Sequence, residues 1–440
     1  MNFEKLKKAC QARGIEEVEV YTRKQSGSNV STFNGEVDQS QIFEETEFSV
    51  RGVYNGHIVA VYTEKDSDDE IEKIADLLVS NGKVIESDDP YFIYGGSEKY
   101  PEIKKAENDF ESYTQEDKIK LCRDIEAKIR EQSSLVANTA VEISVSSSSV
   151  SIENTNGLNI SRSGDQAVVV PQVFVSNGTT VKTGYDVQFL KNIKDFDMER
   201  SLKVALQRPL ASIDAGFVNS GSYPVVFENT VAASLLRSFS SLFSAEAVIK
   251  KMCLLSGKLG QKVFGENITL VDDPLDERAV YQTSFDDEGV AAFTKTVVEN
   301  GVLKTYLHNL KTAKMMDAES TGNGFKDRNG NIDVSVSNLY LKTNDVSLDE
   351  MIKDIKEGIF ITEMQGMHAG LNPVSGQFNL QSSGFKIENG KVTSPITLFI
   401  VSGNIVDMLN NVVCISNDFE YSYGVGSGSV YVKALNISGK

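Results

Sequence analysis

Asn-Gly dipeptides recur along this 440-residue sequence, and they constrain its fold more than any other feature. Both residues tolerate positive φ, so Asn-Gly favours the tight turns that join antiparallel strands. Runs with the alternating pattern of half-buried strands lie between several of these turns, as at residues 18–21, 48–53 and 143–145. The sequence therefore predicts many β-hairpins. The nine dipeptides begin at Asn34, Asn55, Asn81, Asn156, Asn177, Asn300, Asn323, Asn329 and Asn389.

Four of these turns suggest an internal repeat. Asn34 and Asn55 lie 21 residues apart, as do Asn156 and Asn177, and the two pairs are offset by 122 residues. Each pair is flanked by similar predicted elements: a leading helix (2–13 and 115–131), four strands, and a second helix (from about 66, and 199–207). We interpret this as a duplicated αββββα unit. The alternative is a chance coincidence of common turns.

The predicted fold class is α+β, with hairpin-rich antiparallel or mixed sheets and flanking helices. The expected domains are an N-terminal α+β unit (1–85), a polar, acidic connector (86–114), a second α+β unit (115–210) and a C-terminal β-rich domain (211–440). Thr114 and Asp117 can cap the helix 115–131, which has a stripe of apolar residues. In the last domain a helix is expected over 231–251, where apolar residues recur at helical spacing.

Charge and composition exclude several functions. The chain has 44 Lys and Arg against 62 Asp and Glu, a net charge of −18, and no basic block, which disfavours direct binding of nucleic acid. The three His are far apart and the four Cys form no metal-ligand pair, so a built-in zinc site is not expected. We find neither an export signal nor a membrane-spanning stretch, and we expect a cytoplasmic protein with reduced thiols.

Three local features of the sequence are candidate sites. The glycine-rich segment 423–429 precedes a strand, whereas a phosphate-binding loop precedes a helix, so we expect a flexible or peptide-contacting loop. The acidic clusters 272–273 and 286–288 could bind a cation, but turn chemistry explains them more simply. His368 lies in a glycine-bounded segment that could present it at a surface, although a lone His is more often structural. From the residues alone, no self-sufficient active site is recognised.

The second half of the chain resembles the PmbA/TldD family, named for candidate modulators of DNA gyrase. The resemblance rests on eight segments in the family's order, of which Gly370-Leu-Asn-Pro-Val-Ser-Gly376 is one, and it extends to Asn34-Gly-Glu36 and Val50-Arg-Gly52. It covers nearly the whole chain. The eight segments are residues 221–227, 270–274, 285–290, 300–307, 320–324, 370–376, 383–390 and 416–418.

The resemblance also distinguishes two branches. The TldD-like branch resembles metallopeptidases with a His-Glu-x-x-x-His helix and a Cys ligand in a late glycine-rich loop. At the matching helix this sequence has Arg237 and Leu242 at the His positions and Ser238 at the Glu position. Arg stays protonated and Leu has no donor atom, so neither can bind a metal. The late loop has no Cys; Cys414 lies upstream. The chain is thus similar to the PmbA/TldE branch, which lacks the metal.

The resemblance implies a heterodimer with a TldD-like subunit that binds the zinc, while this chain binds no cofactor and has no catalytic residue. The pair would degrade or process unfolded peptides. Such a peptide could bind by adding a strand to an exposed sheet edge. A homodimer is expected when the chain is isolated. Two alternatives remain open: a regulatory protein of the gyrase-modulator type, and an autonomous peptidase with an unrecognised site. The candidates for lining a peptide path are His368, Asn372, Pro373, Gly376, Phe378, Gly424, Gly426, Ser427 and Gly428.

Overall fold

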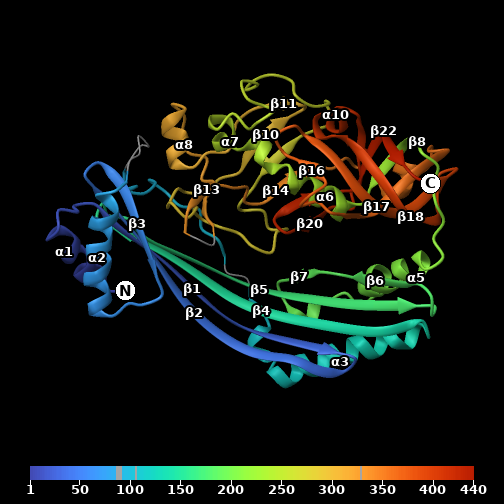
Figure 1. Cartoon of the computed structure of the whole chain (residues 1–440), viewed down its shortest axis with the longest axis horizontal. Coiled ribbons are helices and arrows are strands. Elements are labelled where there is room, and N and C mark those ends of the chain that lie inside the picture. The colour runs from blue at the N-terminus through green and yellow to red at the C-terminus, as the bar shows by residue number, and fades with distance from the viewer. Residues whose placement is uncertain (86–91, 105–106, 328–329) are drawn as a thin grey trace. The chain divides into compact units, whose positions relative to one another are not determined.

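The computed structural model describes all residues except 86–91, 105–106 and 328–329 (Figure 1). The chain forms two compact units. The N-terminal unit comprises Met1–Ile213, Val280–Ala292 and Asn309–Ile332, and the C-terminal unit comprises Asp214–Ala279, Phe293–His308 and Asp333–Lys440. Two short segments from the second half of the sequence therefore belong to the N-terminal unit. Among the described residues, no helix is long and apolar enough to cross a membrane.

One antiparallel sheet organises the N-terminal unit. Its strand order is β3-β2-β1-β4-β5-β6, with β7 beside β5. Strands β1 to β3 form one meander and β4 to β6 form a second, and the two meet at the β1–β4 pair. On each side of this pair the first, second and third strands of a copy follow one another outward. This confirms the predicted repeat. The strands are β1 Val18–Phe33, β2 Glu36–Tyr54, β3 His57–Thr63, β4 Val136–Asn154, β5 Asn159–Ser176, β6 Val181–Tyr185 and β7 Gln188–Leu190.

The predicted number of strands was wrong for the first copy. It has three strands rather than four, because β1 and β2 run without interruption for 16 and 19 residues. Apart from one bulge near Ser31, their pairing is continuous from the Asn34 turn to Gly52. Segments that look like separate short strands in the sequence are parts of these long ones.

Helices cover this sheet (Figure 1). Helices α1 (Phe3–Gln11) and α2 (Asp68–Gly82) share a buried apolar cluster with β1 to β3, and α3 (Gln115–Gln132) shares one with β4 and β5. The capping box of α3 is confirmed, since Thr114 and Asp117 exchange hydrogen bonds. The remaining helical segments are η1 Phe110–Ser112, η2 Ile193–Asp195, α4 Met198–Ser201, a π-helical stretch Leu202–Gln207, α5 Arg208–Ser212 and α8 Leu310–Met315. The short strand β12 (Gly324–Lys326) also lies in this unit.

Six of the nine Asn-Gly dipeptides join antiparallel strands as predicted. At Asn34, Asn55, Asn300 and Asn389 both the Asn and the following Gly have positive φ, and the turns at Asn156 and Asn177 are longer. Two dipeptides were misread. Asn81-Gly82 ends helix α2, and a Cβ on Gly82 would lie 2.6 Å from the Tyr54 ring. Gly324 lies beside Glu288, where a Cβ would lie 2.5 Å from a carboxylate oxygen. The dipeptide at Asn329 lies outside the described residues. At Gly82 and Gly324 the absence of a side chain allows close packing.

The C-terminal unit contains a β-barrel. Its strand order is β15-β8-β22-β18-β17-β16, with β19 beside β22, and β15 also pairs with β17, so five strands close on themselves. The strands are β8 Gly221–Phe227, β15 Glu357–Gln365, β16 Leu371–Asn372, β17 Gln377–Glu388, β18 Lys391–Asn404, β19 Val412–Ile415 and β22 Val430–Ser438. The predicted α+β class is therefore confirmed in both units.

A second sheet and four helices complete this unit. The sheet has the order β11-β10-β9-β14-β21-β20 and comprises β9 Leu270–Asp272, β10 Lys295–Glu299, β11 Val302–Leu303, β14 Leu339–Leu341, β20 Glu420–Ser422 and β21 Val425–Ser427. The helices are α6 Asn229–Ser238, α7 Ala245–Ile249, α9 Leu348–Ile352 and α10 Ile405–Asn410, with a 3-10 turn at Ser240–Phe243. Strand β13 (Ile332–Val334) lies where the chain passes between the units.

The single helix predicted over 231–251 was wrong. Helix α6 ends at Ser238, Phe239 leaves the helical region with φ −108° and ψ 12°, and Ser244 caps the separate helix α7. The Ser238 hydroxyl donates to the carbonyl of Ser234, a bond by which serine competes with the helix. The apolar residues that suggested one helix are buried on α6, at the break and in the 3-10 turn that follows it, at Val231, Leu235, Leu236, Phe239, Leu242 and Phe243.

Candidate functional site

Arg237 stands near the C-terminal end of α6, at the position where the resemblance to the TldD-like branch places a His. Its guanidinium carbon lies 5.1 Å from the centre of the Tyr423 ring, in the turn between β20 and β21. A cation is favoured at the C-terminal end of a helix and over an aromatic face. Within the described residues, Arg237 makes no side-chain hydrogen bond or ion pair besides this ring contact. The helix and the late glycine-rich segment therefore meet, with a cation between them.

Ser238 connects the same helix end to a third segment. Its Oγ lies 3.5 Å from the Sδ of Met367, in the turn that follows β15 and carries His368. His368 is exposed. The structure therefore brings together three stretches that are far apart in the sequence: the end of α6, the turn 366–370 and the β20–β21 hairpin. We call them together the α6 site.

The residues at the metal positions do not fit a metal. Arg237 is exposed, whereas Leu242 is 2% exposed and lies beyond the break in the helix. Neither side chain offers a lone pair, and the Ser238 hydroxyl is engaged with Ser234 and Met367. Within the described part of the chain, no group of three His, Cys, Asp or Glu side chains is placed to hold a metal ion.

The late glycine-rich segment, for which the sequence suggested a flexible or peptide-contacting loop, contains strand β21, paired with β20. Tyr423 and Gly424 have φ of 49° and 77° and form a two-residue turn between β20 and β21. A Cβ on Gly426 would lie 2.4 Å from the Phe419 ring, and one on Gly428 would lie 1.8 Å from the Ser416 carbonyl oxygen. Ser427 is buried. Only Tyr423 and Gly424 retain exposed surface, and the other small residues permit close packing.

The segment 372–378 forms a second tight turn. The Asn372 side chain is exposed, and its Oδ1 accepts hydrogen bonds from the backbone of Val374 and Ser375. Gly376 has φ 74°, and Pro373 is half-buried. Phe378 differs from these residues, because its side chain has no exposed surface and its ring packs edge-on against Phe239, 6.5 Å between centres. In this unit Phe378 is a core residue.

A buried charged cluster in the N-terminal unit was missed by the sequence reasoning. Arg51 on β2 forms an ion pair with Glu19 on β1, with 2.6 Å between Nη2 and Oε1, and its Nη1 lies 4.0 Å from Glu288. Arg162 on β5 pairs with Asp287 at 2.5 Å. The acidic cluster 286–288 is therefore more than a turn, because two of its carboxylates pair with arginines of the sheet.

The third carboxylate does serve the turn, as predicted. Asp286 accepts hydrogen bonds from the backbone N–H groups of Glu288, Val290 and Gly324. Burial, together with the nearby Glu288 carboxylate, raises the pKa of Asp286 to about 8. Burial likewise raises the pKa of Glu288, against the opposing effect of Arg51. The cluster binds the segments 280–292 and 309–332 to the sheet of this unit.

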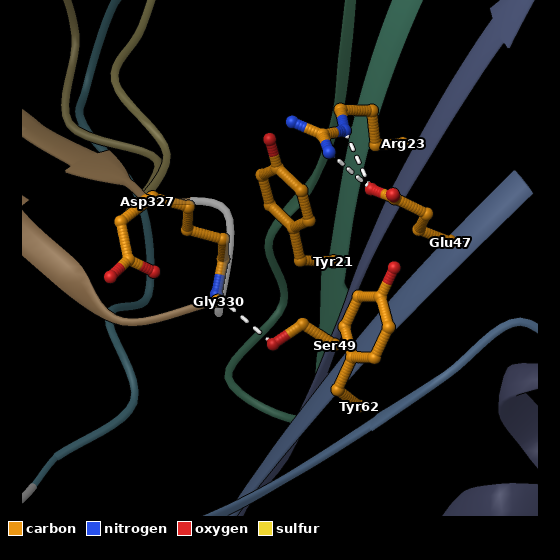
Figure 2. Close-up of a pocket in the computed structure, with 8 residues that line it drawn as sticks. Tyr21, Arg23, Glu47, Ser49, Tyr62, Asp327 and Gly330 are labelled. Carbon is orange, nitrogen blue, oxygen red and sulfur yellow. Dashed lines mark hydrogen bonds and ion pairs between the residues drawn. The ribbon is translucent and has the colours of Figure 1, made fainter.

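A small, open pocket lies beside this cluster (Figure 2). The Lys326 amino group donates to the Ser49 hydroxyl at 3.2 Å and lies 4.8 Å from the Tyr21 ring centre. Burial, then the charge of Arg51, lowers the pKa of Lys326 to about 8. Other residues that line it are Arg23, Glu47, Tyr62, Asp327 and Gly330. A lowered lysine pKa in a pocket is typical of functional sites, but structural ion networks produce it too.

Three domain models of one known family match the chain. The model described as PmbA/TldA metallopeptidase C-terminal domain matches residues 220–439, the one described as domain 1 matches 18–82, and the one described as the central domain matches 108–211. The chain belongs to the PmbA/TldD family. The family's first two models each cover one copy of the repeat in the N-terminal unit, and the third covers the barrel and the α6 site.

Individual relatives of this PmbA/TldD-family chain are similar to it in sequence or in fold. A metalloprotease of Methanocaldococcus jannaschii is 34% identical over 235 residues, 53% of this chain and 52% of the relative, so the match spans about half of that protein. An uncharacterized protein of the same organism is 28% identical over the full length of both chains. A solved structure described as a candidate modulator of a DNA gyrase, from Thermotoga maritima, is 28% identical over 99% of each chain, with a TM-score of 0.89. TldE from Thermococcus kodakarensis (22% identity, TM-score 0.88, 99% of each chain) has the same fold.

The two sites differ in how far the sequence revealed them. Arg237, Ser238 and the late hairpin were found through the family's motif order. Val50-Arg-Gly52 was also recognised as a family segment, but nothing in the sequence linked Arg51 to Glu19 or Glu288. No sequence pattern marks Lys326 as a site residue, because its lowered pKa depends on burial by residues that are distant in sequence.

Proposed function

We propose that this chain is the subunit without metal in a two-subunit cytoplasmic metallopeptidase, and that a TldD-like partner with an intact His-Glu-x-x-x-His helix supplies the zinc and the hydrolysis. The observation that carries the proposal is the chemistry at positions 237, 238 and 242, where an arginine, an engaged serine and a buried leucine replace the metal-binding residues. The metalloprotease names of several relatives support the reaction class.

In this proposal the chain contributes surface to the peptide path. The exposed residues are Arg237, His368 and Tyr423 in the α6 site and Asn372 in the turn that follows, all in the C-terminal unit. They combine a held guanidinium, an imidazole and an amide, which suit polar contacts with an extended peptide. The buried candidates Gly426, Ser427, Gly428 and Phe378 would shape this surface from below.

The experiment compares the purified chain, the TldD-like partner and the mixture of the two on an unfolded peptide. We expect hydrolysis only in the mixture, with zinc bound in the partner, and loss of activity when a chelator removes it. Turnover by this chain alone would overturn the proposal and favour an autonomous peptidase. Full activity of the partner without this chain would also overturn it.

A second candidate is a regulatory protein of the gyrase-modulator type, favoured by the description of the Thermotoga maritima structure. The net charge of −18 argues that such a protein would act through protein contacts and not on DNA directly. A supercoiling assay with purified gyrase tests it: a change in gyrase rate at stoichiometric amounts of this chain would support it, and no change would exclude it.

A further inference from the structure

Strand β2 has a long open edge. Strand β3 pairs only with residues 48–54 of β2, so residues 36–47 pair with β1 on one side and with no strand on the other among the described residues. Figure 1 shows β2 continuing along the margin of the sheet well beyond β3. At ~3.3 Å per residue this stretch is about 40 Å long. It offers a row of outward N–H and C=O groups to an added strand.

The open stretch is exposed on both faces. Residues 36–42 are all exposed, and the Ile42 side chain is 78% exposed. Helix α3 reaches it at one point, where Gln115 donates to the Ser40 hydroxyl and the Gln41 carbonyl at 3.2 Å each. Long exposed edges with apolar side chains are usually paired or covered in folded proteins.

In the second copy of the repeat the equivalent stretch is covered on one face by other residues of the same unit. The equivalent stretch of β5, near residues 159–166, is contacted by residues 281–287 of the same unit: Arg162 donates to the Thr283 hydroxyl at 2.8 Å and to the Phe285 carbonyl. A Cβ on Gly164 would lie 2.7 Å from the Tyr281 ring, so that ring lies directly on the strand. The chain supplies no equivalent for the first copy among the described residues.

The charge of the open stretch indicates what can pair with it. Residues 36–47 contain five acidic side chains and no basic one. Glu36, Glu44 and Glu45 make no ion pair within the described residues, whereas Asp38 accepts from Ser31 and Glu47 is paired with Arg23. A second copy of this chain would place like charges opposite one another, which is unfavourable across a strand pair. A positively charged strand would be attracted.

We propose that the open edge of β2, residues 36–47, binds an extended, positively charged peptide segment by strand addition. Backbone pairing makes the site tolerant of sequence, and the three free glutamates select for Lys and Arg side chains. This goes beyond the proposed function, which concerns the α6 site. It would give the chain a means of holding an unfolded basic peptide at a second place.

The test measures binding of a fluorescent decapeptide of alternating Lys and Val to the full chain. The Glu36→Gln, Glu44→Gln, Glu45→Gln triple variant removes the free charges without disturbing a hydrogen bond. We expect it to weaken binding about tenfold, and more at low salt than at high salt. The matched control is Glu4→Gln, Glu131→Gln, Glu319→Gln, which removes the same charge from exposed glutamates elsewhere and should change binding about twofold or less.

Two further measurements locate the peptide. A decapeptide with N-methyl groups on alternate residues keeps its charge but loses backbone donors, and it should not bind. Hydrogen exchange should slow at residues 36–47 on binding and stay unchanged at 159–166. Equal loss in both triple variants, tight binding of the methylated peptide, protection elsewhere, or pairing of two copies of this chain through β2 would each overturn the proposal. None of these outcomes bears on hydrolysis by the complex, so failure here leaves the proposed function intact.

Discussion

Replacement of Arg51 by Met should strongly destabilise the N-terminal unit. Arg51 is 12% exposed and lies between the fully buried Glu19 carboxylate and Glu288, which is 6% exposed. In the Arg51→Met variant the Glu19 carboxylate loses its arginine. Within the described structure its remaining side-chain donor is then Asn154, whose Nδ2 lies 3.2 Å from Glu19 Oε2. Leaving a buried charge without its partner costs about 3–5 kcal/mol. Arg23→Met is the matched control, because the Arg23–Glu47 pair is 36% and 24% exposed and should cost at most about 1 kcal/mol.

The coupling between the partners can be measured with a double-mutant cycle. In the Glu19→Gln, Arg51→Met variant the buried carboxylate is gone, so most of the loss should be recovered, and the interaction energy should be about 2 kcal/mol or more. Hydrogen exchange of β1 and β2 amides in denaturant reports the unit's free energy of unfolding, and amides of β22 serve as an internal reference in the other unit. A cost below about 1 kcal/mol for Arg51→Met, or additive single variants, would refute the reasoning.

The pH dependence of the same variant provides a second check. Arg51 lowers the pKa of Glu288, which burial otherwise raises. Without Arg51 that pKa rises further, so the native state binds a proton that the unfolded state releases, and stability falls as the pH rises through this window. The deficit of Arg51→Met should therefore shrink as the pH is lowered from about 7 to about 5. A deficit that grows on acidification would contradict this account.

Four further predictions concern other residues. Because the pKa of Lys326 is lowered from 10.5 to about 8, the wild-type chain should gain stability as the pH rises between these values, and Lys326→Met should abolish this gain in thermal melts at several pH values. Gly428→Ala should cost about 1–3 kcal/mol in urea unfolding, because its Cβ would lie 1.8 Å from the Ser416 carbonyl; an unchanged midpoint would contradict the packing role. Phe378→Ala should cost about 3–5 kcal/mol, and a peptide-binding defect at full stability would show that its role is recognition and not core packing. Zinc or a chelator should leave the melting temperature of the isolated chain unchanged, and a zinc-dependent rise would reveal a site that the metal positions do not provide.

Local sequence predicted the turns and ends of elements well. The paired positive φ values at Asn34-Gly35 and Asn55-Gly56 follow from what these residues tolerate, and the capping box of α3 follows from Thr114 and Asp117 alone. The duplicated unit was also recognisable, because the turn spacing preserved in the two copies sets the lengths of β2 and β5. These features depend on residues that are close together in the chain.

The errors arose where distant packing decides. Asn81-Gly82 looks like a turn, but Tyr54 lies where a Cβ on Gly82 would be, so close packing accounts for the glycine. The helix over 231–251 kept its apolar spacing and still broke at Phe239. For the acidic cluster 286–288 the sequence predicts turn chemistry alone, which holds for Asp286. It does not predict the ion pairs of the other two carboxylates, because their arginines come from positions 51 and 162.

The sequence by itself determined the hairpins, the repeat and the absence of metal-binding side chains at positions 237, 238 and 242, since these follow from residue chemistry and short-range spacing. Only the tertiary structure decided that Arg237 lies over Tyr423, that Phe378 is core and that Lys326 is buried beside charged groups. It also decided that residues 159–166 of one copy are covered on a face, whereas residues 36–42 of the other are exposed. The physical reason is that burial, strand pairing and ion pairing depend on segments that are far apart in the chain. A local sequence pattern does not show which distant segment will pack against it.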